Sequence, residues 1–191
     1  MKRDIILAGV GGQGILSIAA VIGMAAVESG LYLKQAEVHG MSQRGGAVES
    51  HLRISDKPIS SDLIPEGKCD MILSVEPMEA LRYLPFLTEE GWIITSSKPF
   101  RNIDDYPEEE ALYREIRKVK NHLIVDAHTM AAELGSQKVS NMVMLGAASE
   151  HLPLAQDHLE GALYSIFGRK GDAVVTLNIE ALEAGKRAVN N

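Results

Sequence analysis

The stretch that most constrains this chain is residues 4–14, where an apolar run leads directly into four glycines. Residues 4–8, Asp-Ile-Ile-Leu-Ala, are typical of a short, fully buried β-strand, and residues 15–27 have the composition of a helix. The glycines between them are Gly9, Gly11, Gly12 and Gly14. The pattern therefore predicts a strand, a tight turn and a helix.

Three of these glycines, Gly9, Gly11 and Gly14, have the G-x-G-x-x-G spacing of dinucleotide-binding loops. In such loops the first glycine permits the turn, the second lets a ligand approach the backbone, and the third allows close helix–strand packing. The helix N-terminus that follows favours an anion. A dinucleotide site also needs an acidic residue about 20 residues further on, which holds a ribose hydroxyl. Glu28 and Glu37 are the candidates, and neither clearly meets this requirement. Three interpretations stay open for this loop, which includes Gln13: packing alone, contact with a phosphate or cofactor, and contact with a partner subunit.

Length, charge and cysteine content limit which kinds of protein this chain can be. The 191 residues are enough for one well-filled domain, so residues 1–191 are expected to form a single domain. The net charge of −7, without a basic stripe, argues against a nucleic-acid partner. Residues 15–27 are apolar almost all round but shorter than the ~20 residues that span a bilayer, so we expect a buried helix, no membrane contact and a cytoplasmic location. Cys69 is the only cysteine, which excludes an iron–sulfur cluster held by this chain alone.

Strand and helix patterns alternate along most of the chain. Further strands are predicted at residues 31–38, 47–54, 69–75, 91–95 and 122–125, and helices at residues 77–84, 107–118, 127–134, 141–151, 155–167 and 172–188. This order predicts an α/β, Rossmann-like fold: a mostly parallel sheet with helices on both faces and a helical C-terminal region. The alternating stretch 47–54 is expected to be half-exposed and antiparallel to its neighbour, with Glu49, His51 and Arg53 on its polar side.

The densest polar cluster is residues 39–46, between two predicted strands. Its candidate site residues are His39, Ser42, Gln43, Arg44, Gly45 and Gly46. Arg44 beside two glycines can offer a guanidinium and backbone N–H groups to a phosphate or carboxylate, although a structural loop with Arg44 paired to an acidic neighbour is the simpler alternative. Ligands of parallel sheets lie beyond the carboxyl ends of the strands, so the loops at 9–14, 39–46 and 76–77 are expected to converge there.

Other polar residues have simpler explanations. His39 and His51 lack a convincing third ligand for a metal. Asp126 and His128 follow a predicted strand at its carboxyl end, where functional groups occur, yet Asp126 is better explained as a helix cap. Asn141 is interpreted in the same way, as a cap or as a polar group at an interface. No metal site is therefore predicted.

Together, the two glycine-rich stretches resemble the gamma-type subunit, or domain, of the 2-oxoacid:ferredoxin oxidoreductases. Residues 9–16, Gly-Val-Gly-Gly-Gln-Gly-Ile-Leu, are similar to the family's opening motif. Residues 36–48, continuing to 50–53, are similar to the form seen in the small (beta) subunit of indolepyruvate ferredoxin oxidoreductase. The similarity extends through residues 74–77 and 141–146, and so spans most of the chain.

The resemblance implies a subunit of an enzyme that oxidatively decarboxylates a 2-oxoacid with thiamine diphosphate, reduces ferredoxin through iron–sulfur clusters and forms an acyl-CoA. Thiamine diphosphate, its Mg ion and the clusters are expected in a large alpha subunit, with coenzyme A an option at the interface. Residues 9–14 and 39–46 become candidates for cofactor binding or for that interface, and no residue is implied to be catalytic. The implied substrate is indolepyruvate or another aryl pyruvate, and this chain would complete and shield the active site.

Two other functions stay open on the residues alone. One is a free-standing nucleotide- or dinucleotide-binding protein that uses residues 9–14, and the other is a self-contained dehydrogenase with His39 or His128 as acid–base. A homodimer of the isolated chain is an option in each case.

Overall fold

The structure is a computed structural model that describes residues 1–40 and 45–189. Its strands are β1 (Lys2–Val10), β2 (Tyr32–His39), β3 (Ala47–Ser55), β4 (Cys69–Ser74), β5 (Leu87–Ser96) and β6 (Asn121–Val125). Its α-helices are α1 (Ile15–Glu28), α2 (Pro77–Arg82), α3 (Glu109–Ile116), α4 (Ala127–Glu133), α5 (Ser140–Ala148), α6 (Gln156–Phe167) and α7 (Asp172–Val189). Short 3-10 helices lie at Leu84–Phe86, Gln137–Val139, Ser149–His151 and Gly168–Lys170.

The strands form one sheet in the order β2-β3-β1-β4-β5-β6. The pairs β1–β4, β4–β5 and β5–β6 are parallel, whereas β3 is antiparallel to both β1 and β2. Every strand except β3 therefore runs in the same direction. The predicted α/β, mostly parallel fold is confirmed, and so is the antiparallel strand at 47–54.

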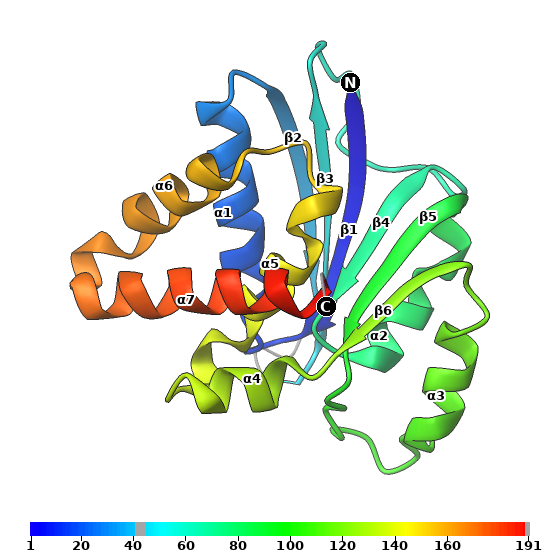
Figure 1. Cartoon of the computed structure of the whole chain (residues 1–191). Helices are drawn as coiled ribbons and strands as arrows, with labels where there is room; N and C mark the ends of the chain where they lie inside the picture. Colours follow the sequence, from blue (N-terminus) through cyan, green and yellow to red (C-terminus); the bar gives the residue numbers. More distant parts are fainter. Residues whose placement is uncertain (41–44, 190–191) are drawn as a thin grey trace.

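Helices cover both faces of this sheet, as predicted (Figure 1). On one face, Ile5 and Leu7 of β1 belong to an apolar cluster with residues of α1, α4, α5, α6 and α7, and on the other, Ile6 and Ala8 belong to a cluster with residues of α2 and α3. These four strand residues are fully buried because each face of β1 has its own apolar layer. An unbroken apolar run, rather than an alternating one, is what such a strand requires.

Helix α1 differs from the buried helix that its composition predicted. Its inner face joins the larger apolar cluster, but Leu16, Met24 and Val27 are 44%, 38% and 62% exposed. Helices α5 and α6 pack on α1 but leave these three side chains partly exposed. Helix α1 has apolar residues on every face, but only part of its surface is buried.

Helices α5 and α7 cross in direct backbone contact. A Cβ atom added to Gly146 would lie 1.9 Å from the carbonyl oxygen of Leu182, and one added to Gly185 would lie 1.9 Å from the carbonyl oxygen of Val143. Only glycine fits at either position, so these two residues fix how closely the C-terminal helix packs.

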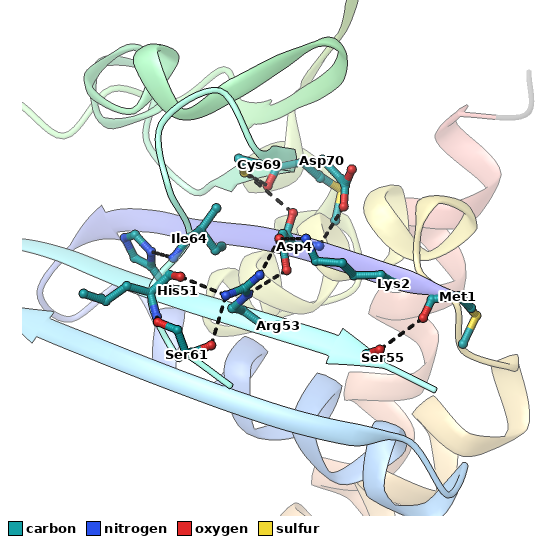
Figure 2. A network of polar contacts seen from close by, with 12 residues as sticks. Met1, Lys2, Asp4, His51, Arg53, Ser55, Ser61, Ile64, Cys69 and Asp70 are labelled. Carbon is teal, nitrogen blue, oxygen red and sulfur yellow. Dashed lines mark hydrogen bonds and ion pairs between the residues drawn. The ribbon is translucent and has the colours of Figure 1, made fainter. Parts of the chain in front are cut away.

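A buried ion pair holds the segment 56–68 over the second face of the sheet (Figure 2). Arg53 of β3 donates from Nε and Nη2 to the two carboxylate oxygens of Asp4, at 2.9 and 3.1 Å, and from Nη1 to the carbonyl oxygens of Ser61 and Leu63. The Asp4 side chain is fully buried. The same guanidinium therefore joins β1, β3 and the covering segment.

His51 lies under this segment, which corrects the half-exposed position that alternation predicted for it. Its Nδ1 accepts a hydrogen bond of 3.0 Å from the backbone N–H of Ile64 (Figure 2). Its ring also meets Phe86 edge-on, at 5.6 Å between centroids. Alternation identifies which side of β3 a residue faces, but not whether a distant segment covers that side. His51 is consequently a structural acceptor, separate from the loop at 39–46.

Because the imidazole of His51 is buried, we expect the protein to lose stability in acid. Burial lowers the pKa of His51, and Arg53 adds to this effect while Glu49 and Asp62 oppose it. The pKa of His51 in the folded protein lies below its unfolded value of about 6.5. The stability that neutral His51 contributes is therefore complete above about pH 6.5 and is lost as the pH falls through the folded pKa. We expect His51→Ala to cost about 1–3 kcal/mol at pH 7.5, through the orphaned Ile64 N–H.

Urea unfolding at pH 7.5 and 5.0 tests this explanation. Between pH 7.5 and pH 5.0, the free energy of unfolding should fall less in His51→Ala than in wild type. Some pH dependence should remain in the variant, because burial also lowers the pKa of His151. Equal acid sensitivity of the two proteins would contradict the assigned role of His51.

Candidate functional site

Two glycine-rich loops meet at the carboxyl end of β1. We call residues 9–14 the first glycine loop and residues 39–46 the second. The backbone N–H of Gly11 donates to the carbonyl oxygen of Gly46 at 2.8 Å, and the N–H of Gly45 donates to the carbonyl oxygen of Gly11 at 3.4 Å. The convergence of these two loops, expected from the parallel topology, is thus made by direct hydrogen bonds. Ser42, Gln43 and Arg44 lie outside the described residues, and for His39 only the backbone, at the end of β2, is described.

The first glycine loop is closed by Gln13. Its side-chain Oε1 accepts from the N–H of Val10 at 2.8 Å, and its backbone N–H donates to the carbonyl oxygen of Val10 at 3.1 Å. Gly12, with φ +100°, and Gly14, with φ +82°, adopt the left-handed backbone that the sharp reversal needs. The acceptor of Gln13 therefore serves the loop itself.

Each of the three motif glycines makes close contacts within the chain. A Cβ at Gly9 would lie 2.6 Å from Cγ2 of Val75, at the end of β4. A Cβ at Gly14 would lie 2.5 Å from Nδ2 of Asn141, which donates to the carbonyl oxygen of Gly14 and so attaches α5 to the loop. Gly11 uses both its N–H and its carbonyl in contacts with the second glycine loop. Its N–H, the group a dinucleotide would approach, is already bonded.

The strand order also separates this loop from Glu37, the acid at the end of the second strand. In dinucleotide-binding folds the second strand lies beside the first. Here β3 lies between β1 and β2, with Glu37 of β2 opposite Ser50 of β3, which is opposite Leu7 of β1. Two strand spacings, roughly 10 Å, thus separate Glu37 from β1. The dinucleotide arrangement suggested by the motif is not reproduced.

Two cavities flank Gly12 and Gln13. The first, about 310 Å³, lies at the carboxyl ends of β4, β5 and β6, and the second, about 650 Å³, lies between the start of α1 and helices α5 and α7. Lys138 lines both, Lys98 the first and Lys170 the second, and no described carboxylate lines either. The first turn of α1 adds backbone N–H groups that have no partner within the helix and contains no acidic residue. The charge of both cavities favours an anionic ligand.

The lysines were not among the residues that sequence analysis singled out. Lys98 follows the predicted strand 91–95 at its carboxyl end, which is a usable signal for a site residue. Lys138 and Lys170 lie between helices of the C-terminal region, where no local pattern distinguishes them from other surface lysines. Their place in the cavities follows only from how the helices fold back.

The third predicted loop also reaches this edge of the sheet. Val75 donates its N–H to the carbonyl oxygen of Ala8 at 3.0 Å, which brings Glu76 beside the end of β1. Burial raises the pKa of Glu76, whose carboxylate accepts hydrogen bonds from several donors. Residues 97–106, which the sequence analysis left without a role, complete the edge, because Nδ2 of Asn102 donates to the carbonyl oxygen of Gly45.

The remaining candidates have structural roles. Asp126 caps α4 by accepting from the N–H of Thr129 at 3.1 Å, as predicted, and His128 lines the first cavity. Burial raises the pKa of the Cys69 thiol to about 12, which makes it a poor thiolate ligand. Within residues 1–40 and 45–189, no three His, Cys, Asp or Glu side chains gather as a metal site would require. A single buried thiol does not fit the needs of an iron–sulfur cluster.

Membrane insertion finds no support in the described helices, none of which combines the length and the apolar content that a bilayer crossing needs.

Comparison with known proteins identifies the family. The family model described as pyruvate ferredoxin/flavodoxin oxidoreductase matches residues 4–188. Indolepyruvate oxidoreductase subunit IorB of Archaeoglobus fulgidus is 37% identical over 194 residues, which cover 97% of this chain and 94% of that protein. The crystal structure of the keto/oxoacid ferredoxin oxidoreductase gamma subunit of Geobacter sulfurreducens superposes with a TM-score of 0.72 at 25% identity and covers 98% of both chains.

A larger protein contains the same fold. The 2-oxoglutarate:ferredoxin oxidoreductase of Magnetococcus marinus, solved with 2-oxoglutarate, coenzyme A and succinyl-CoA bound, has a TM-score of 0.79 at 22% identity. The match covers 99% of this chain and 31% of that one. The resemblance drawn from the two glycine loops is confirmed: this chain belongs to the pyruvate ferredoxin/flavodoxin oxidoreductase family and is a small subunit of a 2-oxoacid:ferredoxin oxidoreductase.

Proposed function

We propose that residues 1–191 act as a single domain that completes and shields the active site of an indolepyruvate, or other aryl pyruvate, oxidoreductase. The larger alpha subunit would carry thiamine diphosphate, Mg and the iron–sulfur clusters, and the complex would reduce ferredoxin. The observation that carries the proposal is the pair of hydrogen bonds between Gly11 and residues 45–46, which joins both family motifs at one edge of the sheet. The IorB relative supports indolepyruvate as the substrate.

The contribution of this chain would be to exclude water and to bind an anionic ligand, since Lys98 and Lys138 line the first cavity at this edge and no described carboxylate does. Closing a site against water strengthens the electrostatic interactions inside it. Lys98 and Lys138, beside the start of α1, fit the phosphates of coenzyme A, which the Magnetococcus marinus enzyme binds. We propose that coenzyme A contacts this chain in the first cavity.

Co-expression with the alpha subunit tests the assignment. We expect ferredoxin reduction with indolepyruvate and coenzyme A only when both chains are present. Full activity of the alpha subunit alone would overturn the proposal that this chain completes the site.

Two lysine substitutions test the coenzyme A contact in the assembled enzyme. The double variant Lys98→Ala, Lys138→Ala is expected to raise the KM for coenzyme A about 10-fold, the equivalent of 1.4 kcal/mol, because two positive charges near its phosphates are lost. The matched control is Lys57→Ala, Lys68→Ala, which removes two exposed lysines outside these cavities. Steady-state kinetics with varied coenzyme A should show no change in the control, and an equal rise in both would argue against the contact.

A free-standing dinucleotide-binding protein fits this geometry less well, because the Gly11 N–H is bonded within the chain and β3 separates β1 from Glu37. Calorimetry of the isolated chain with NAD, FAD and coenzyme A distinguishes the two functions. Tight binding of NAD or FAD by the isolated chain would favour the alternative.

A further inference from the structure

One buried carboxylate ties an irregular stretch of chain to the end of β4. We call residues 97–106 the rim segment. Glu76 is fully buried, and its Oε1 accepts from the backbone N–H of Phe100 at 3.3 Å and from the hydroxyl of Tyr106. Its Oε2 accepts from the N–H of Glu79 at 2.8 Å and so caps α2. Helix capping occupies one carboxylate oxygen, and the other holds the rim segment at two points.

The rim segment in turn contacts the second glycine loop. Asn102, between the two residues held by Glu76, donates from Nδ2 to the carbonyl oxygen of Gly45, and Gly45 is bonded to Gly11 of the first glycine loop. A continuous series of hydrogen bonds therefore runs from Glu76, through the rim segment, to both family motifs. Residues 97–106 contain no helix or strand. These side-chain contacts therefore help to fix their position, together with the bond from the Ser97 N–H to the carbonyl oxygen of Val125 at 2.8 Å and the Arg101–Glu109 ion pair at 2.8 Å.

The segment held in this way presents apolar side chains to solvent. Phe100 and Ile103 are 39% and 49% exposed, and Phe100 lines the first cavity together with Lys98. Large apolar side chains that are fixed before binding make effective contact sites, because little conformational entropy remains to be lost on association. Burying a carboxylate is unfavourable unless its oxygens are hydrogen-bonded, and the rim segment supplies two of the three donors to Glu76.

We infer that Glu76 is a positioning residue, which holds the rim segment against the second glycine loop so that Phe100 and Ile103 are preformed for contact with the larger subunit. This inference rests on the proposed function, because it takes the larger subunit as the occupant of the edge. The motif Ser-Val-Glu-Pro at residues 74–77 then has a physical meaning: it places this carboxylate at the carboxyl end of the sheet.

Hydrogen exchange of the isolated chain tests the positioning role independently of any partner. Glu76→Gln leaves one oxygen for three donors, and Tyr106→Phe removes one donor while keeping the ring. Both variants are expected to exchange the Phe100 amide and its neighbours in the rim segment at least 10-fold faster than wild type. Glu79→Gln is the matched control, since Glu79 is a similarly buried acid of α2 whose carboxylate oxygens, in the described part of the chain, accept from Arg82 at 2.9 and 3.0 Å.

Unchanged exchange in both Glu76→Gln and Tyr106→Phe would overturn the positioning role. Tyr106→Phe keeps the test decisive should Glu76→Gln lose its fold, since it leaves the cap of α2 intact.

Association with the alpha subunit tests the purpose of the positioning. The association rate constant of Tyr106→Phe should fall about 10-fold, with that of Glu79→Gln unchanged. Wild-type association speed in a variant whose rim segment exchanges rapidly would overturn the inference. Failure of the wild-type chain to associate at all would instead refute the proposed function and leave the exchange result standing.

Discussion

Replacing Gly185 by alanine is expected to lower the free energy of unfolding by about 3 kcal/mol or more. The new Cβ would lie 1.9 Å from the carbonyl oxygen of Val143 and 2.9 Å from the backbone nitrogen of Ala147. Both are main-chain atoms of α5, which cannot rotate aside, so α7 has to move away from its partner helix. Gly146→Ala should have a similar effect, because it meets the backbone of Leu182 at the same crossing.

Urea unfolding followed by circular dichroism measures these changes. Gly161→Ala is the matched control: it also lies within a helix, α6, but its Cβ would meet only the flexible end of Glu28, at 3.3 Å. Because alanine favours a helix over glycine by roughly 0.5–1 kcal/mol, this control should be neutral or stabilising. The double variant Gly146→Ala, Gly185→Ala should cost less than the sum of the two, since one displacement relieves both contacts. Additive costs would indicate that the two glycines do not share one crossing.

Arg53→Ala is expected to cost about 3–5 kcal/mol, because it leaves the carboxylate of Asp4 buried without its bidentate partner. The guanidinium also holds Ser61 and Leu63 through their carbonyl oxygens. Its loss should release the segment 56–68 and with it the hydrogen bond from Ile64 to His51 (Figure 2). Thermal unfolding and hydrogen exchange of residues 61–64 measure the two consequences.

Lys2→Ala is the control for this ion pair. Lys2 contacts the same carboxylate at 2.6 Å, but its side chain is 53% exposed, so its removal should cost no more than about 1 kcal/mol. A double variant, Asp4→Leu with Arg53→Met, should recover part of the stability, because no charge is then left buried. Equal costs for Arg53→Ala and Lys2→Ala would contradict the importance assigned to burial.

The fold was predictable because its signals are local. Residues 4–8 and 69–75 are short apolar runs, which are typical of strands covered on both faces. The glycines that follow residue 8 favour a tight turn between the first strand and the helix. The alternation at 47–54 predicted the single antiparallel strand. Asp126 could be assigned as a helix cap because an N-cap depends on the residues that immediately follow it.

Individual contacts at the edge of the sheet were much less predictable. The spacing of Gly9, Gly11 and Gly14 left packing, a ligand and a partner subunit open, and it did not predict that their neighbours within the chain are Val75, residues 45–46 and Asn141. The loop at 76–77 was predicted to reach this edge, but the burial of Glu76 and its bonds to the rim segment were not, because the rim segment carried no pattern. The buried position of His51 was missed for the same reason, since the segment that covers it comes from another part of the chain.

The sequence by itself thus determined the α/β class, most element positions and, through two separated motifs, the family. Periodicity and turn chemistry depend on residues within a few positions of one another, so they are legible before folding. Tertiary structure alone decided that Gly11 bonds Gly46, that Glu76 holds the rim segment, and that Gly146 and Gly185 let two helices touch. These contacts join residues distant in sequence, and they exist only once the sheet order and the helix crossings have brought their backbones together.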